Sequence, residues 1–133
     1  MKVGDYVRTK NGIIGKIIDK NMAEVDDRYE LDYNNKLYYY YQIAKSSSSI
    51  IDLLEEHDLV VIEYYSLRYK ERVARLFEVD FKDKKFIVLK NAYCDFMLEN
   101  NKFNAKDKKL KPIIKSIITK EQIESIKYEV NYE

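Results

Sequence analysis

The chain of 133 residues has few of the residues that interrupt secondary structure or form crosslinks: one Pro, three Gly and one Cys. It has no Trp. Because Cys94 is the only cysteine, neither an internal disulfide nor a zinc site built on cysteines can form, and we expect a reducing, cytoplasmic setting. The longest apolar runs have four residues, such as 59–62, so we expect no transmembrane helix and no membrane partner. Asp5, Arg8 and Lys10 interrupt the N-terminal segment, and we expect no signal peptide.

The chain also lacks an excess of positive or of negative charge. Lys and Arg number 24 against 23 Asp and Glu, which leaves a net charge of +1. No overall field therefore draws the chain to DNA or to an anionic membrane. Any contact with nucleic acid would have to come from a local patch of cations.

Residues for catalysis are scarce. The single histidine, His57, follows an acidic segment in a predicted turn, and it could pair with Cys94 only if the fold brought the two together. The sequence has no GxxxxGK[ST] or GxGxxG motif and no carboxylates at EF-hand spacing. We therefore predict no catalytic residues, no metal site, no cofactor and a protein that is not an enzyme.

All three glycines fall within the segment 3–18, VGDYVRTKNGIIGKII. Gly4 predicts a turn into a strand, Asn11-Gly12 a tight hairpin, and Gly15 a bend or a close backbone approach in the return strand. This pattern is typical of the opening of a small SH3-like or KOW-like β-barrel. Such barrels bind partners more often than they catalyse.

Further strands and short helices are predicted along the rest of the chain. Strands are expected at 6–10, 13–19, 24–33 (with a turn at 26–27), 37–44, 59–65, 72–79, 86–90 and 113–118. Short helices are expected at 50–56 and from Thr119 to about Lys127, the second because Thr119 and Gln122 have capping-box spacing. Residues 101–111 read as a solvated loop, and 91–100 are ambiguous.

These elements predict a mainly β protein with short helices (α+β), built from one or two small SH3-like barrels in tandem. We expect an N-terminal barrel over 1–48, a connector helix over 49–58, and a second, diverged barrel or α+β unit over 59–133 that ends in a short helix. A single mixed α+β domain is the alternative.

Three segments resemble small proteins of phages and prophages of low-GC Gram-positive bacteria: 3–17, SIIDLLEEHD at 49–58 and IITKEQIESIKY at 117–128. The resemblance spans most of the chain and departs at His57, where a glycine is usual. It implies an accessory protein that acts in a bacterial host and inhibits a host protein or ribonucleoprotein complex, a CRISPR effector being one example. The shared motifs are structural and carry over no catalytic residue.

Aromatic and basic side chains are interleaved through 64–75, on one predicted hairpin. Arginine grips phosphate or carboxylate with two hydrogen bonds, and tyrosine stacks bases or anchors a protein interface, so the hairpin fits either partner. Its predicted protein-binding residues are Tyr65, Arg68, Tyr69, Arg72 and Arg75. Its predicted nucleic-acid-binding residues, in the alternative function of a KOW/SH3-like nucleic-acid-binding module, are Arg68, Lys70, Arg72 and Arg75. A polar hairpin whose rings pack inward is the plain alternative.

Four consecutive tyrosines, Tyr38, Tyr39, Tyr40 and Tyr41, form the second candidate surface. In a strand, alternation places two rings on each face, so two tyrosines lie off the core face. They either pack between the two blocks or meet a partner, because tyrosine is enriched at binding hot spots.

A lysine-rich segment is the third candidate. It contributes Lys102, Lys106, Lys108, Lys109 and Lys111, either as a solvated loop or as a strip that contacts phosphates.

Overall fold

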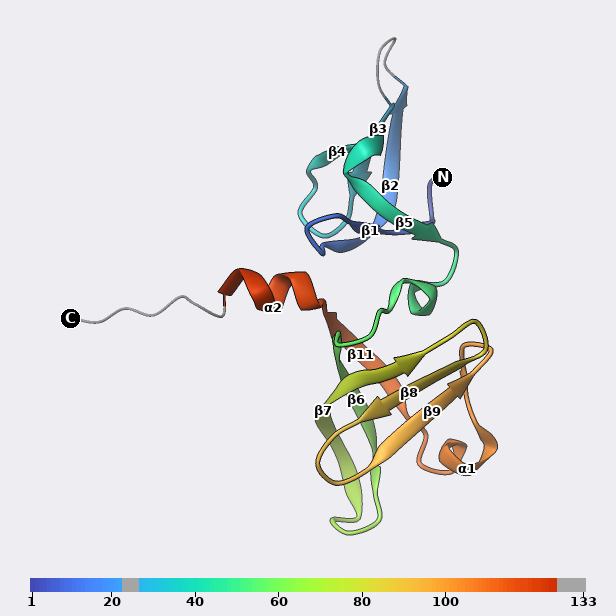
Figure 1. The fold of residues 1–133 in the computed structure, drawn as a ribbon. Coiled ribbons are helices and arrows are strands. Elements are labelled where there is room, and N and C mark those ends of the chain that lie inside the picture. The colour runs from blue at the N-terminus through green and yellow to red at the C-terminus, as the bar shows by residue number, and fades with distance from the viewer. Residues whose placement is uncertain (23–26, 127–133) are drawn as a thin grey trace, which may run out of the picture. The chain divides into compact units, whose positions relative to one another are not determined.

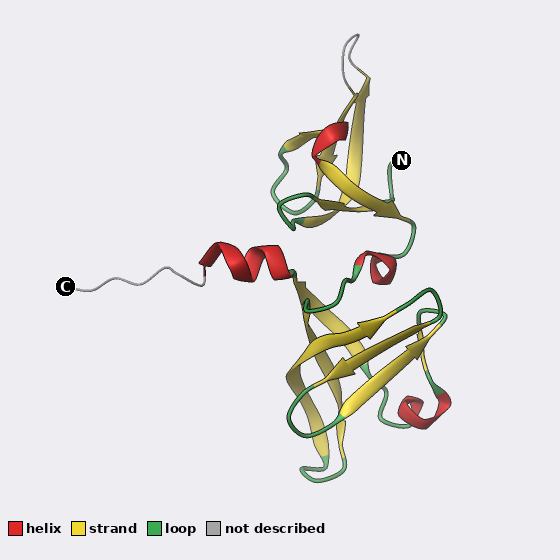
Figure 2. Ribbon diagram, in the orientation of Figure 1, coloured by secondary structure: helices red, strands yellow, loops and turns green. Residues whose placement is uncertain are grey.

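The computed structural model describes residues 1–22 and 27–126 (Figure 1). Its contacts divide the chain into two units, one of Met1–Leu53 with the segment from Glu121, the other of Leu54–Lys120. Figure 2 shows a mainly β fold with short helices, as the sequence predicts, and each unit has its own sheet. The division at 48 and 59 into a barrel, a connector and a second barrel stays a prediction. No helix among the described residues is long and apolar enough to cross a membrane.

The first unit is an antiparallel sheet with strand order β4-β3-β2-β1-β5. Its strands are β1 (Tyr6–Thr9), β2 (Ile14–Met22), β3 (Asp27–Leu31), β4 (Leu37–Tyr39) and β5 (Ile43–Ser47). Only the 3₁₀ turn η1 (Tyr40–Gln42) separates β4 from β5, although these two strands are the opposite edges of the sheet. The sheet therefore curls strongly around its core, which consists of Val7, Ile17, Tyr29, Leu31 and Tyr38.

The opening hairpin follows the glycine pattern. The N–H of Gly12 donates to the carbonyl of Thr9 at 3.0 Å, and Val7 pairs with Gly15 across β1 and β2. Gly4 and Gly12 have φ of 96° and 90°, which glycine adopts without strain. A Cβ at Gly15 would lie 3.1 Å from the Leu31 Cβ, so the predicted close backbone approach is confirmed. Residues 23–26, which include the start of the predicted strand 24–33 and part of its turn, lie outside the described residues.

The second unit is an antiparallel sheet with strand order β10-β9-β8-β7-β6-β11. Its strands are β6 (Leu59–Ser66), β7 (Glu71–Lys82), β8 (Phe86–Lys90), β9 (Asp95–Glu99), β10 (Lys102–Phe103) and β11 (Ile113–Ile118). Alternate residues of β6 to β9 point into one core: Val60, Ile62, Phe77, Val79, Ile87, Leu89, Phe96 and Leu98. This period of two is the signature of a sheet with one buried face.

The expected strand 37–44 is wrong as a single element. The side-chain oxygen of Gln42 accepts the N–H of Tyr39 at 2.8 Å, and this contact closes the turn η1. The chain then leaves the β4 edge and enters β5, which pairs with β1.

The expected helix at 50–56 is shorter than predicted. The 3₁₀ helix η2 ends at Leu53, and the following residue, Leu54, is fully buried. The Asp58 carboxylate accepts the N–H of Glu55 at 2.8 Å, so the chain turns there instead of continuing as a helix.

Residues 101–111 are more ordered than the expected solvated loop, and the ambiguous segment 91–100 contains a strand. Together these residues form β9, β10 and the short helix α1 (Ala105–Lys108), whose cap is the Asn104 side chain. Asp107 is buried in this segment, and its carboxylate accepts the N–H of Met97 at 3.1 Å. The lysine-rich composition of this segment predicts a solvated loop and gives no sign of the hydrogen bond between Asp107 and Met97.

Helix α2 (Lys120–Ile126) begins after the buried Thr119, as the capping-box spacing predicts. The fully buried carboxylate of Asp58 accepts the N–H of Lys120 at 2.9 Å, and so fixes the start of the helix. The predicted end near Lys127 lies outside the described residues.

Candidate functional site

A cavity of about 700 Å³ lies in the second unit. It is lined by the tip of the β6–β7 hairpin, the turn between β8 and β9, and α1 with the residues that follow it. All three segments lie at the lower end of this unit in Figure 1. The volume is within the usual range of ligand pockets, and we call this cavity the pocket.

Aromatic rings build one part of the pocket wall. Tyr64 and Phe96 line it, and their ring centroids lie 5.2 Å apart in an edge-to-face arrangement. Phe96 makes similar contacts with Phe77 at 5.3 Å and with Phe103 at 5.7 Å. Such contacts favour one packing of the rings, so this wall is preorganised.

The turn after β8 places Cys94 in the same wall. The Asn91 side-chain oxygen accepts the N–H groups of Tyr93 and Cys94, each at 2.9 Å, and holds the turn. The Cys94 sulfur lies 3.9 Å from the Tyr64 hydroxyl. Burial is the main reason why the pKa of Cys94 is raised; the hydrogen bond with Tyr64 lowers this pKa, and the charge of Asp95 raises it.

Burial also raises the pKa of Tyr64, and its hydrogen bond with Cys94 acts in the same direction. Near neutral pH the wall therefore offers a neutral thiol and a neutral phenol. Thiolate chemistry would need the opposite shift. The histidine that could have served as a base, His57, does not line the pocket.

Three tyrosines line the pocket and are open to solvent: Tyr65 is 37% exposed, Tyr69 56% and Tyr93 93%. An exposed ring with a free face is a stacking surface for a planar group. Tyr69 already has the Arg68 guanidinium 5.5 Å from its ring centroid, a cation–π contact.

Four exposed cations also line the pocket: Arg68, Arg75, Lys106 and Lys109. Over residues 1–22 and 27–126, none of the four forms an ion pair with a carboxylate. Among the residues that the structure describes, the carboxylates that line the same space are Asp95 and the buried Asp107. The pocket therefore has an excess of positive charge in a chain that is almost neutral overall.

Comparison with protein-family models, with curated proteins and with solved structures finds no match. What the pocket can bind is therefore argued from its own residues.

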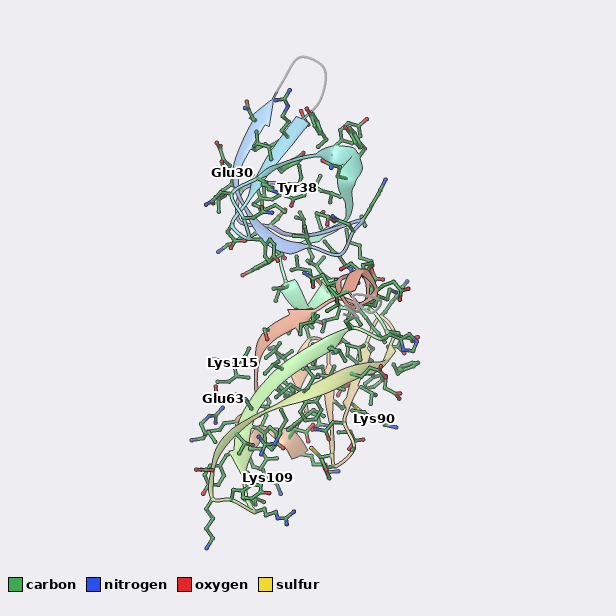
Figure 3. All side chains as sticks on the ribbon, turned by 90° about the vertical axis from the view of Figure 1, so that its left-hand side faces the viewer. Glu30, Tyr38, Glu63, Lys90, Lys109 and Lys115 are labelled. Atoms are coloured by element: carbon green, nitrogen blue, oxygen red, sulfur yellow. The ribbon has the colours of Figure 1, made fainter. Side chains whose placement is uncertain are left out.

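The fold brings together six of the residues predicted from the sequence: Tyr65, Arg68, Tyr69, Arg75, Lys106 and Lys109. Figure 3 shows Lys109 at the lower end of the second unit. The remaining predicted cations do not line the pocket: Lys70, Arg72, Lys102, Lys108 and Lys111. Arg72 instead bonds within the unit, to Glu63 and to the Lys111 carbonyl.

The tyrosine run lies in the first unit and has a different arrangement from the one expected. Tyr38 is buried in the core, and its hydroxyl accepts a hydrogen bond from the Asn34 amide. Tyr39 and Tyr41 stack with centroids 5.3 Å apart, and Tyr40 meets Tyr41 edge-on. Tyr40 and Tyr41 are exposed, and the turn η1 rather than strand alternation takes them off the core face.

Tyr93, Cys94 and Phe96 also line the pocket, although the sequence does not predict them as parts of a binding site. The available signal was DFMLE at 95–99, a short apolar run between two acidic residues, which is consistent with a strand. Within the described ranges, no group of three or more His, Cys, Asp or Glu residues is placed to hold a metal ion.

Proposed function

We propose that the protein is a non-enzymatic binding module whose pocket holds a segment of single-stranded nucleic acid. The observation that carries the proposal is the meeting, around one cavity, of three exposed tyrosines with four exposed cations that form no ion pair within residues 1–22 and 27–126. Bases stack on the rings whatever their sequence, and the cations contact the phosphates between them.

The chemistry of the wall favours a single strand over a duplex. In a duplex the base faces are covered by neighbouring bases, whereas a single strand can place an unstacked base against an aromatic ring. Arginine adds two parallel hydrogen bonds to a phosphate, which lysine cannot make. Arg68 and Arg75 would fix the strand, and Lys106 and Lys109 would add charge.

We also propose a fold class for each of the two units. We regard the first unit as a small SH3-like, KOW-like barrel and the second as a diverged copy in tandem with it. The curled five-stranded sheet and the glycine-rich opening hairpin support the first half of this idea.

Binding is tested by fluorescence anisotropy with a labelled oligothymidylate of about 12 nucleotides and a duplex of the same length. We expect the single strand to bind more tightly. Tyr69→Ala removes a stacking ring and should weaken binding about tenfold. Tyr33→Ala, which removes an exposed tyrosine of the first unit, is the matched control and should leave the affinity unchanged.

A charge-matched pair completes the test. Lys109→Gln should weaken binding, whereas Lys84→Gln, in an exposed turn outside the pocket, should not. No binding of the single strand at about 50 mM salt would refute the proposal. Equal effects of Lys109→Gln and Lys84→Gln would refute the assignment to the pocket.

The exposed tyrosines of the first unit favour a second candidate function. We propose it as the phage-type accessory protein that the sequence resemblance implies, an inhibitor of a host protein or ribonucleoprotein complex. Arg28 lies 5.1 Å from the Tyr39 ring centroid, and Tyr39 stacks on Tyr41, so a cation and two rings form one ladder. Tyr41 and the adjoining Tyr40, which meets it edge-on, are exposed, and they match the tyrosine-rich composition of binding hot spots.

This second candidate is tested in a host whose CRISPR system restricts a phage. Expression of the protein should restore plaque formation, and Tyr41→Ala should abolish the effect while Tyr69→Ala preserves it. Failure of the unaltered protein to restore plaques excludes CRISPR interference as the target.

A further inference from the structure

Arg72 connects the β6–β7 hairpin to the segment that follows α1. Its Nη2 donates to the Lys111 carbonyl at 2.9 Å. The N–H of Tyr65, the residue paired with Arg72 across the hairpin, donates to the Leu110 carbonyl at 2.8 Å. Two hydrogen bonds, one from each strand, therefore hold residues 110–111 against the hairpin.

The attached segment is one wall of the pocket. Lys106, Lys109 and Leu110 line the pocket, whereas Arg72 does not. A shift of residues 110–111 would thus move two of the four pocket cations relative to Arg68, Arg75 and the hairpin tyrosines. Arg72 acts on the pocket through this wall and not through direct contact.

Glu63 holds the Arg72 guanidinium in position. The Arg72 Nε donates to Glu63 Oε1 at 3.0 Å, and Nη2 also contacts the Glu63 carbonyl at 3.2 Å. The second carboxylate oxygen, Oε2, lies 3.6 Å from the Lys115 Nζ, and Figure 3 shows Glu63 and Lys115 side by side. The hydrogen bond from Arg72 is the main reason why the pKa of Glu63 is lowered.

We infer that Arg72 and Glu63 form a clamp that positions the lysine-bearing wall of the pocket, so that both are positioning residues and not ligand contacts. The inference rests on the proposed function, because it concerns the same pocket. It replaces the expectation that Arg72 touches the partner directly.

The direction in which Glu63→Gln changes the affinity for the oligonucleotide distinguishes the clamp from a purely electrostatic effect. Glu63→Gln removes a negative charge near a cationic site, so simple electrostatics predicts tighter binding of the labelled oligothymidylate. The clamp predicts the opposite, a Kd raised about tenfold in both Glu63→Gln and Arg72→Gln. Lys115→Gln removes the other partner of Glu63 but leaves the clamp intact, and it is the control.

Arginine geometry gives a second criterion. Arg72→Lys keeps the charge but loses the planar fork that joins Glu63 and the Lys111 carbonyl. The clamp predicts that Arg72→Lys binds as weakly as Arg72→Gln, because both variants release the wall that carries Lys106 and Lys109. A direct phosphate contact predicts that Arg72→Lys retains affinity, and that Arg72→Gln lowers the slope of log K against log salt by about 0.7.

Hydrogen–deuterium exchange tests the clamp without a ligand. The Tyr65 amide should lose protection in Glu63→Gln and Arg72→Gln, while the amides of β8 keep theirs. General destabilisation would expose both sets. Unchanged protection at Tyr65, or tighter binding by Glu63→Gln, overturns the inference. Failure of the unaltered protein to bind the oligonucleotide would refute the proposed function, and the exchange experiment would still decide whether the clamp exists.

Discussion

The hydroxyl of Tyr64 lies 3.9 Å from the sulfur of Cys94, so strand β6 and the β8–β9 turn meet inside the pocket through two groups of raised pKa. A raised pKa means that each group keeps its proton to higher pH than it would in water. The only cysteine of the chain is therefore part of a neutral wall, although it is open enough to line a cavity.

Cys94 should react slowly with a thiol-alkylating reagent. The thiolate is the reactive form, and the raised pKa reduces its share at any pH below that pKa. The pH profile of the alkylation rate should have its midpoint above the value of about 8.5 of a free cysteine. The urea-unfolded chain is the control and should show that ordinary midpoint. A folded-state midpoint below that of the unfolded chain would contradict the assigned burial.

His57→Gly should stabilise the second unit. His57 has φ of 75°, in the left-handed region that a side chain disfavours. The gain should be about 0.5 to 1 kcal/mol in urea unfolding, because glycine relieves the strain but adds freedom to the unfolded chain. His57→Ala keeps the Cβ and should give no gain. Equal stability of the glycine and alanine variants would show that φ is not the cause.

Gly15→Ala should destabilise the first unit by about 2 kcal/mol. The new Cβ would lie 3.1 Å from the Leu31 Cβ and 3.3 Å from an Asp32 carboxylate oxygen, so the sheet would have to shift. Urea unfolding measures the loss. Ser46→Ala, at an exposed position of β5, should change stability by less than about 0.5 kcal/mol. A Gly15→Ala protein as stable as the original would disprove the close approach.

Arg8→Ala should cost the first unit about 3 kcal/mol. Arg8 is fully buried, and it donates to the Leu53 carbonyl at 3.0 Å and to Glu121 Oε2 at 2.6 Å. Glu121→Gln retains an oxygen acceptor and should cost only about 1 kcal/mol. Urea unfolding compares both with Lys10→Ala, an exposed control on the same hairpin. Unfolding of Arg8→Ala and Lys10→Ala at the same urea concentration would show that the buried contacts of Arg8 do not stabilise the first unit.

Much of the strand pattern could be predicted because local chemistry determines it. The Asn11-Gly12 hairpin, the strands 59–65, 86–90 and 113–118, and the helix after Thr119 all follow from turn residues, alternation or capping. Their signals lie within a few residues of the elements themselves. Tertiary contacts add to them without changing the element type.

The elements that depend on distant contacts could not be predicted. Gln42 closes a turn inside a run that reads as a strand, and the buried Asp107 joins an apparent loop to β9. Asp58 reads as a turn acid but also fixes the start of α2, at a separation that no local pattern reveals. The same holds for the site. The sequence indicates Arg68 and Lys109 separately, and only the fold places both around one pocket.

The salt dependence of oligothymidylate binding tests the central claim most directly. If Arg68, Arg75, Lys106 and Lys109 each contact a phosphate of the single strand, log K should fall against log salt with a slope of about −3. Lys109→Gln should reduce that slope to about −2, and Lys84→Gln should leave it unchanged. A slope near zero, or a slope that Lys109→Gln does not alter, would contradict the claim that this pocket binds the nucleic acid backbone.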